Sequence, residues 1–158
     1  MKKVFEAKIE LPMKFASGNQ MIVARKRLIR TKEYHAYHDY LKASLEEILD
    51  EVQVQMKPGQ AYELRSLFVY PVPKSLVNSK KKRDEFDSSK VLPITRGTID
   101  IDNSVKASDD VLQDVLGFDD SQIVNNLGYK RYWLGETYIY KFELYEFDSG
   151  MEIEFYGD

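Results

Sequence analysis

Apolar and polar residues alternate along several segments of the chain, which is the pattern of half-buried β-strands. In residues 4–11 one face of such a strand carries Phe5, Ala7, Ile9 and Leu11. Residues 62–72 are rich in aromatic and branched side chains and predict a central strand that closes at Pro71 and Pro73. Residues 122–133 and 136–147 predict two strands joined as a hairpin near Leu134-Gly135. Residues 21–29 and the tail from Asp148 predict shorter extended pieces.

Two other segments have the spacing of amphipathic helices. Thr31 is a favourable N-cap, and the residues after it predict a helix to about residue 53 with an apolar stripe of Tyr34, Tyr37, Leu41, Leu45, Ile48 and Val52. The second helix is expected from Val105 to Leu116, with Asn103 and Ser104 at its start and Gly117 at its end. Before it, Asp100 and Asp102 alternate with isoleucines, which predicts an extended segment with both carboxylates on one face.

These elements predict an α+β fold. We expect a mixed β-sheet of about four to five strands with two α-helices packed on it. A chain of 158 residues with 43% hydrophobic residues is long enough to form one core, so residues 1–158 are expected to be a single domain.

The composition bears on the cellular location of the protein and on the metal sites that it can form. There is no cysteine, hence no disulfide and no thiolate metal site, which suits a cytoplasmic protein. No apolar run approaches the roughly 20 residues of a membrane span, so no membrane partner is expected. The charged, alternating N-terminus does not resemble a signal peptide. His35 and His38 have no cysteine or acidic motif beside them and are expected on the solvent side of the first helix.

Charge is divided unevenly between the two parts of the chain. Residues 1–99 carry 19 Lys and Arg against 12 Asp and Glu, whereas residues 100–158 carry 4 against 14, and the whole chain has a net charge of −3. A basic part beside an acidic centre suits a metal-dependent enzyme that acts on a polyanion. The alternative is an acidic protein whose charges are unevenly placed.

The long segment from Lys74 to Gly97 contains most of the clustered positive charge. We expect phosphate contacts from Lys80, Lys81, Lys82, Arg83 and Arg96. The alternative is an ordinary solvated loop.

The acidic centre is the stretch from Thr98 to Ile123, which holds seven aspartates and one lysine. If the strand after Asp120 packs beside the Asp100 segment, several like charges meet, which requires a proton or a cation among them. Oxygen ligands without cysteine or histidine favour Mg²⁺, or Mn²⁺, over zinc. Lys106 lies four residues from Asp102 and from Asp110 and faces both on a helix. Asp109 and Asp114 are expected on the solvated face of that helix.

The ordered set D-I-D-N-S-V-K, Asp110 and D-D-S-Q-I resembles the signature of the RusA-type Holliday junction resolvases of bacteria and prophages. Upstream, F-V-Y-P-V-P-K-S and S-K-K-K-R resemble the strand and basic loop that precede the acidic motif in that family. The resemblance implies a homodimer and a Mg²⁺-dependent endodeoxyribonuclease that resolves four-way DNA junctions by paired symmetric nicks, in recombination and repair.

The resemblance also implies roles for individual residues. Asp100, Asp102 and Asp120 match the three metal-binding, catalytic aspartates of the family, and Lys106 matches its lysine. Asp119 and Asp110 are second choices as metal ligands. Two alternatives stay open: a metal-dependent endonuclease for other branched DNA, and a non-catalytic DNA-binding protein on the same fold.

Overall fold

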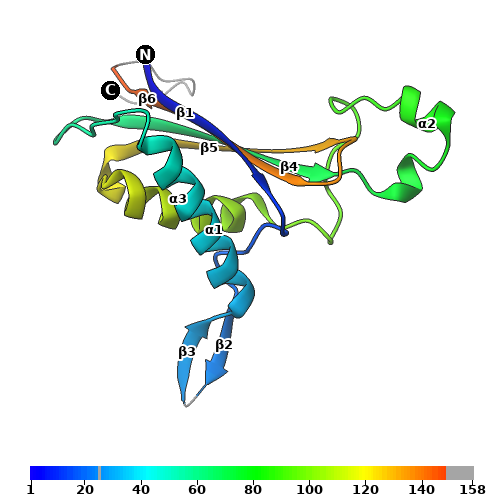
Figure 1. Cartoon of the computed structure of the whole chain (residues 1–158), viewed down its shortest axis with the longest axis horizontal. Helices are drawn as coiled ribbons and strands as arrows, with labels where there is room; N and C mark the ends of the chain where they lie inside the picture. Colours follow the sequence, from blue (N-terminus) through cyan, green and yellow to red (C-terminus); the bar gives the residue numbers. More distant parts are fainter. Residues whose placement is uncertain (25, 149–158) are drawn as a thin grey trace, which may run out of the picture.

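The structure is a computed structural model and describes residues 1–24 and 26–148. Figure 1 shows how the helices and strands are arranged. In chain order the elements are β1 (Lys2–Leu11), β2 (Met21–Ala24), β3 (Arg27–Arg30), α1 (Lys32–Leu49), β4 (Tyr62–Pro71), η1 (Lys74–Leu76), α2 (Lys80–Asp84), α3 (Ile101–Leu116), η2 (Asp120–Gln122), β5 (Ile123–Trp133) and β6 (Tyr138–Glu146).

Four strands form a mixed sheet in the order β1-β6-β4-β5. β6 pairs antiparallel with both β1 and β4, and β4 pairs parallel with β5. Helices α1 and α3 contact each other and lie on one face of this sheet (Figure 1). The predicted α+β fold with a mixed sheet and two packed helices is confirmed, with α2 as a third, short helix.

The core lies between the sheet and the two long helices. The predicted alternation of β1 and the apolar stripe of α1 are both confirmed, because they supply buried side chains to this core: Phe5, Ala7, Ile9, Leu11, Tyr34, Tyr37, Leu41 and Leu45. Burial of each leucine, isoleucine or phenylalanine side chain in this set contributes about 1.5–3 kcal/mol to folding. Thr31 caps α1 as expected, since its hydroxyl accepts a hydrogen bond from the Tyr34 backbone N–H.

The predicted β5–β6 hairpin is wrong. The two strands are joined by a short connection, but β4 lies between them in the sheet. The pairing of β4 with β5 continues past the end of β4, where the Val72 N–H donates a backbone hydrogen bond of 2.9 Å to the carbonyl of Trp133. The passage from β4 through α3 to β5 is a parallel crossover, so β5 pairs with β4, and β6 takes the other edge of β4.

The extended segment predicted for Asp100 and Asp102 is also wrong. Helix α3 already begins at Ile101, and Asp100 is its N-cap residue. Asp102 lies in the first turn, where a negative charge is favourable next to the free N–H groups of the helix. An alternation of only four residues cannot distinguish a strand from the entry to a helix.

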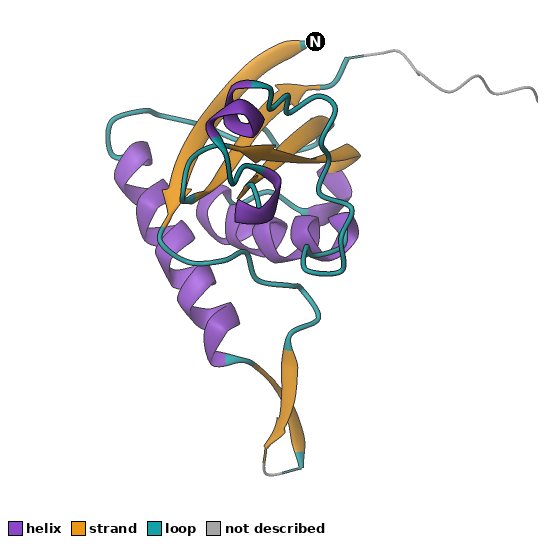
Figure 2. Ribbon diagram, turned by 90° about the vertical axis from the view of Figure 1, so that its right-hand side faces the viewer, coloured by secondary structure: helices purple, strands orange, loops and turns teal. Residues whose placement is uncertain are grey.

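The β2–β3 pair forms a separate two-stranded sheet that projects away from the body of the molecule (Figures 1 and 2). The sequence predicted one extended piece here, and the structure has an antiparallel pair. The expected edge strand in the tail after Asp148 lies outside the described residues.

Candidate active site

A hollow of about 550 Å³ lies along one side of α3, beside β5. We call it the acidic hollow; its lining is Ile101, Asp102, Val105, Lys106, Asp109, Asp110, Gln113, Asp120, Asn126 and Gly128. The helical members recur every three or four residues and therefore share one face of α3. Gly128 allows α3 to approach the strand, since a Cβ there would lie 2.7 Å from Cγ1 of Ile101.

Two of the three predicted catalytic aspartates line this hollow, and the third, Asp100, precedes the lining residue Ile101 in the chain. Asp102 and Asp120 are both exposed and belong to the lining, although they are 18 positions apart in the chain. Asp100 is exposed at the N-cap of α3, where its side chain makes no capping hydrogen bond. Burial lowers the pKa of Lys130, and the nearby charge of Asp100 partly offsets that effect.

The expected convergence of Asp100, Asp102 and Asp120 is not present in a single protomer. Within residues 1–24 and 26–148, no three acidic or histidine side chains lie close enough together to hold a metal ion. The roles of these aspartates as metal ligands therefore stay a prediction.

Asp109 is only partly exposed and lines the acidic hollow, rather than lying on the solvated face of α3 as the sequence predicted. Its Oδ2 accepts a hydrogen bond of 2.6 Å from the Asn126 amide, while its Oδ1 is buried without a hydrogen-bond partner in the described structure. Burial raises the pKa of Asp109 to about 6, and the charges of Asp110 and Asp120 add to this rise while the Asn126 hydrogen bond opposes it. The parallel pairing of β5 with β4 brings Asn126 to this place, and no local pattern indicates it.

Asp110 is held by side chains from outside α3. The Tyr34 hydroxyl donates a hydrogen bond of 2.7 Å to Asp110 Oδ2, and Arg30 lies 3.8 Å from the same oxygen. Arg30 also stacks over the Tyr34 ring at 4.5 Å. Burial, followed by the hydrogen bond to Asp110, raises the pKa of Tyr34 to about 12. Asp110 therefore links α3 to α1 and to the base of the β2–β3 pair.

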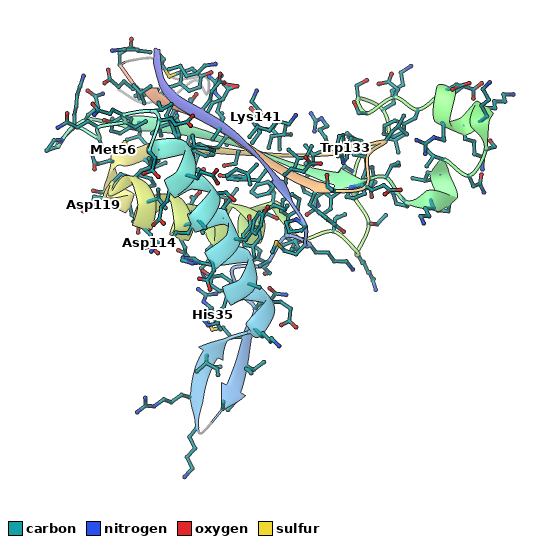
Figure 3. All side chains as sticks on the ribbon, in the orientation of Figure 1. His35, Met56, Asp114, Asp119, Trp133 and Lys141 are labelled. Atoms are coloured by element: carbon teal, nitrogen blue, oxygen red, sulfur yellow. The ribbon has the colours of Figure 1, made fainter. Side chains whose placement is uncertain are left out.

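Asp114 lies on the same helix as Asp110 but outside the acidic hollow, next to a histidine of α1. It is exposed, as predicted, and lies 3.1 Å from Nε2 of His38. His38 is therefore only partly solvent-facing, whereas His35 is exposed as expected. Figure 3 shows Asp114 on the outer side of α3.

Asp119 caps the short helix η2. Its Oδ1 accepts hydrogen bonds from the backbone N–H and the hydroxyl of Ser121, and these bonds lower its pKa. The Gln122 side chain accepts from the Asp119 backbone N–H and donates to the carbonyls of Lys57 and Gln60. The capping role of Asp119 leaves the next carboxylate, Asp120, at the acidic hollow.

Lys106 extends into the acidic hollow from α3. It is exposed and, in the described part of the chain, forms no ion pair. The turn before β2 packs against its aliphatic stem, because a Cβ at Gly18 would lie within 2.8 Å of Lys106 Cβ and Cγ. Gly18 N–H donates to the Asn103 carbonyl at 3.0 Å, and the side chains of Asn19 and Asn103 are 2.7 Å apart.

The predicted basic DNA contacts lie away from the C-terminal end of α3. Lys80, Lys81, Lys82 and Arg83 are exposed in α2, which Ser79 caps. Figure 3 shows α2 and Asp119 at opposite ends of the molecule. Arg96 is exposed in the loop that leads into α3. Whether these residues contact DNA stays a prediction.

The chemistry of the acidic hollow fits a hard divalent cation. Its polar lining offers carboxylate and amide oxygens, together with the buried, unpartnered Oδ1 of Asp109. Neither histidine of the chain belongs to the lining, and the chain has no cysteine. Of the aspartates predicted to bind the metal ion, Asp102 and Asp120 line the hollow.

Comparison with known proteins places the chain in one family. The model of the family "Endodeoxyribonuclease RusA" matches residues 12–139, which include the whole acidic hollow. The uncharacterized protein YqaN of Bacillus subtilis (strain 168) is 42% identical over 55 residues, 35% of this chain and 37% of that relative's length. None of the helices in residues 1–24 and 26–148 has the length and apolar character needed to cross a bilayer. The chain belongs to the RusA endodeoxyribonuclease family.

Proposed function

We propose that this protein is a Mg²⁺-dependent endonuclease that resolves four-way DNA junctions by paired symmetric nicks. The observation that supports it most is the joint placement of Asp102, Lys106 and Asp120 in one hollow, within a chain of the RusA family. A protein that only bound DNA would gain nothing from aspartates that face phosphate, because like charges repel.

Asp102 and Asp120, with Asp100 from the N-cap of α3, are the residues proposed to hold Mg²⁺, and Mn²⁺ has the same ligand preference. Asp119 is the second choice, because its Oδ1 already caps η2. The chemistry that the metal supplies when bound is polarisation of the scissile phosphate and a lowered pKa for the attacking water. Lys106, which lines the acidic hollow and forms no ion pair in the described structure, offers its ammonium group to the negative charge that develops on the phosphate.

The remaining residues bind and orient the DNA in this proposal. Lys80, Lys81, Lys82, Arg83 and Arg96 contact phosphates outside the hollow. A homodimer suits the reaction, since a four-way junction has near two-fold symmetry and one cut is needed on each of two strands. A second protomer also offers a source for the ligand set that one protomer does not assemble.

A nicking assay tests the proposal. We expect cleavage of a synthetic four-way junction in Mg²⁺, with two symmetric nicks, and no cleavage when the metal is chelated. A replication fork and a linear duplex of the same sequence serve as competing substrates. Faster cleavage of the fork would favour an endonuclease for other branched DNA, and binding without any cleavage in Mg²⁺ or Mn²⁺ would leave a non-catalytic binding protein.

A further inference from the structure

The β2–β3 pair presents large apolar side chains to solvent. We call its strands, Met21–Ala24 and Arg27–Arg30, the β2–β3 ribbon; it projects from the body of the molecule beyond the N-terminal end of α1 (Figures 1 and 2). Val23 is 74% exposed and Leu28 is 70% exposed. Met21, Ile22 and Ile29 are exposed as well. Apolar groups concentrated on one projection mark a binding element rather than ordinary surface.

Both faces of the ribbon are apolar at its centre. Residues that pair directly across an antiparallel ladder share a face, and successive pairs alternate between faces. Val23 pairs with Leu28, and the neighbouring pair is Ile22 with Ile29. The ribbon therefore offers apolar contact on two opposite sides, which suits insertion between two surfaces.

The charge of the ribbon and its flanks points to a polyanion. Every charged residue between Glu10 and Glu33 is a lysine or an arginine. Lys26, at the turn, and Arg27, at the start of β3, are exposed. A two-stranded ribbon of this width fits the major groove of DNA, and apolar side chains can enter between base steps when cations hold the adjacent phosphates.

The base of the ribbon is fastened to the helix that carries the candidate site. Gly18 and Asn19, just before β2, bond to Asn103, and Arg30 at the end of β3 lies beside Asp110. Thr31 N–H also donates to the Gln20 carbonyl, which closes the base. DNA bound at the acidic hollow would therefore meet the ribbon in a fixed orientation.

We propose that the β2–β3 ribbon is a wedge that enters the open centre of branched DNA and selects it over linear duplex. Val23 and Leu28 contact base-pair ends that a branch point leaves unstacked, and Lys26 and Arg27 contact the phosphates around it. This inference rests on the proposed function. A second copy of the chain is a poorer occupant, because Lys26 and Arg27 of two facing ribbons would meet as like charges.

The test is binding of the full-length protein to a four-way junction with 2-aminopurine at the branch point, in EDTA so that no strand is cut. Wild-type protein should raise the 2-aminopurine fluorescence as bases unstack. The double variant Val23→Thr, Leu28→Thr keeps β-branched or strand-compatible side chains on the ribbon. We expect it to lose the rise and to lose about tenfold in preference for junction over duplex, with duplex affinity and Tm unchanged.

Val52→Thr is the matched control, since Val52 is an exposed valine beyond the end of α1, away from the ribbon. It should behave as wild type. The inference is overturned if the double variant keeps the wild-type fluorescence rise and the wild-type preference for junction over duplex. It is also overturned if the double variant is a monomer where the wild type is a dimer, because the ribbon would then be a contact between protomers. Failure of the proposed function is recognised separately, because the wild-type protein itself would then show no preference for the junction.

Discussion

Gly18 lies directly against the stem of Lys106, since a Cβ at position 18 would be 2.7 Å from Cδ and 2.8 Å from Cβ of that lysine. Cβ of Lys106 moves only with α3, so a larger residue at position 18 must displace either the turn or the helix. The close approach thus couples the turn that carries the β2–β3 ribbon to a residue proposed to act on the phosphate.

We therefore expect Gly18→Ala to reduce DNA cleavage on the order of 10- to 100-fold, because small misplacements of a catalytic group are costly. It should lower the free energy of unfolding by about 1–3 kcal/mol, as overpacking does. Gly97→Ala is the control, since the nearest atom to its added Cβ is 3.8 Å away. Urea unfolding and junction nicking measure the two effects, and equal activity of both variants would show that the Gly18 contact is unimportant.

Tyr34→Phe removes the hydrogen bond to Asp110 and leaves that carboxylate with Arg30 alone. We expect a loss of about 1.5–3 kcal/mol in the free energy of unfolding, the usual contribution of a hydrogen bond to a charged group. The control is Tyr40→Phe, on the exposed side of the same helix, which should be neutral. Urea denaturation of the wild type and both variants at pH 7 measures the free energies of unfolding. Equal stability of Tyr34→Phe and Tyr40→Phe would show that the hydrogen bond to Asp110 does not stabilise the fold.

Asp109 makes stability depend on pH in a particular direction. Its pKa is raised from 3.8 to about 6 in the folded chain, so the folded state holds the proton more tightly than the unfolded state. The stabilisation is complete below the unfolded pKa and is lost as pH rises through the folded pKa. Between about pH 4 and pH 7, wild type should lose up to about 3 kcal/mol relative to Asp109→Asn. Unfolding of both proteins across this range measures the difference, and a constant difference would refute the raised pKa.

Mg²⁺ should stabilise the folded protein if Asp102 and Asp120 help to bind it. Binding at 100 times the dissociation constant adds about 2.7 kcal/mol to the free energy of unfolding, which raises Tm. Asp102→Asn and Asp120→Asn should lose most of this increment. Asp114→Asn, on the same helix but outside the acidic hollow, should keep it. Thermal unfolding with and without Mg²⁺ measures this, and equal increments in all four proteins would place the metal elsewhere.

The elements set by local pattern could be predicted from the sequence. β1 follows from strict alternation, α1 from its apolar stripe and the Thr31 cap, and the end of α3 from Gly117, which adopts a left-handed φ of 73°. The family could be predicted as well, because the order of the aspartates and Lys106 along the chain resembles the RusA signature.

The remaining features depend on contacts between distant parts of the chain. The place of β4 between β5 and β6 follows from the crossover through α3, which no short segment encodes. The burial of Asp109 depends on Asn126, 17 positions away, across the helix–strand contact at Gly128. Gly128 within a strand-like run was the one available signal of close approach.

The most direct test of the proposed active site is the rate of junction nicking by Asp102→Asn in Mg²⁺, beside Asp114→Asn and the wild type. We expect Asp102→Asn to bind the four-way junction as the wild type does but to cut it at least about 100-fold more slowly, while Asp114→Asn cuts at the wild-type rate. Cleavage by Asp102→Asn at the wild-type rate would contradict the assignment of the acidic hollow as the active site.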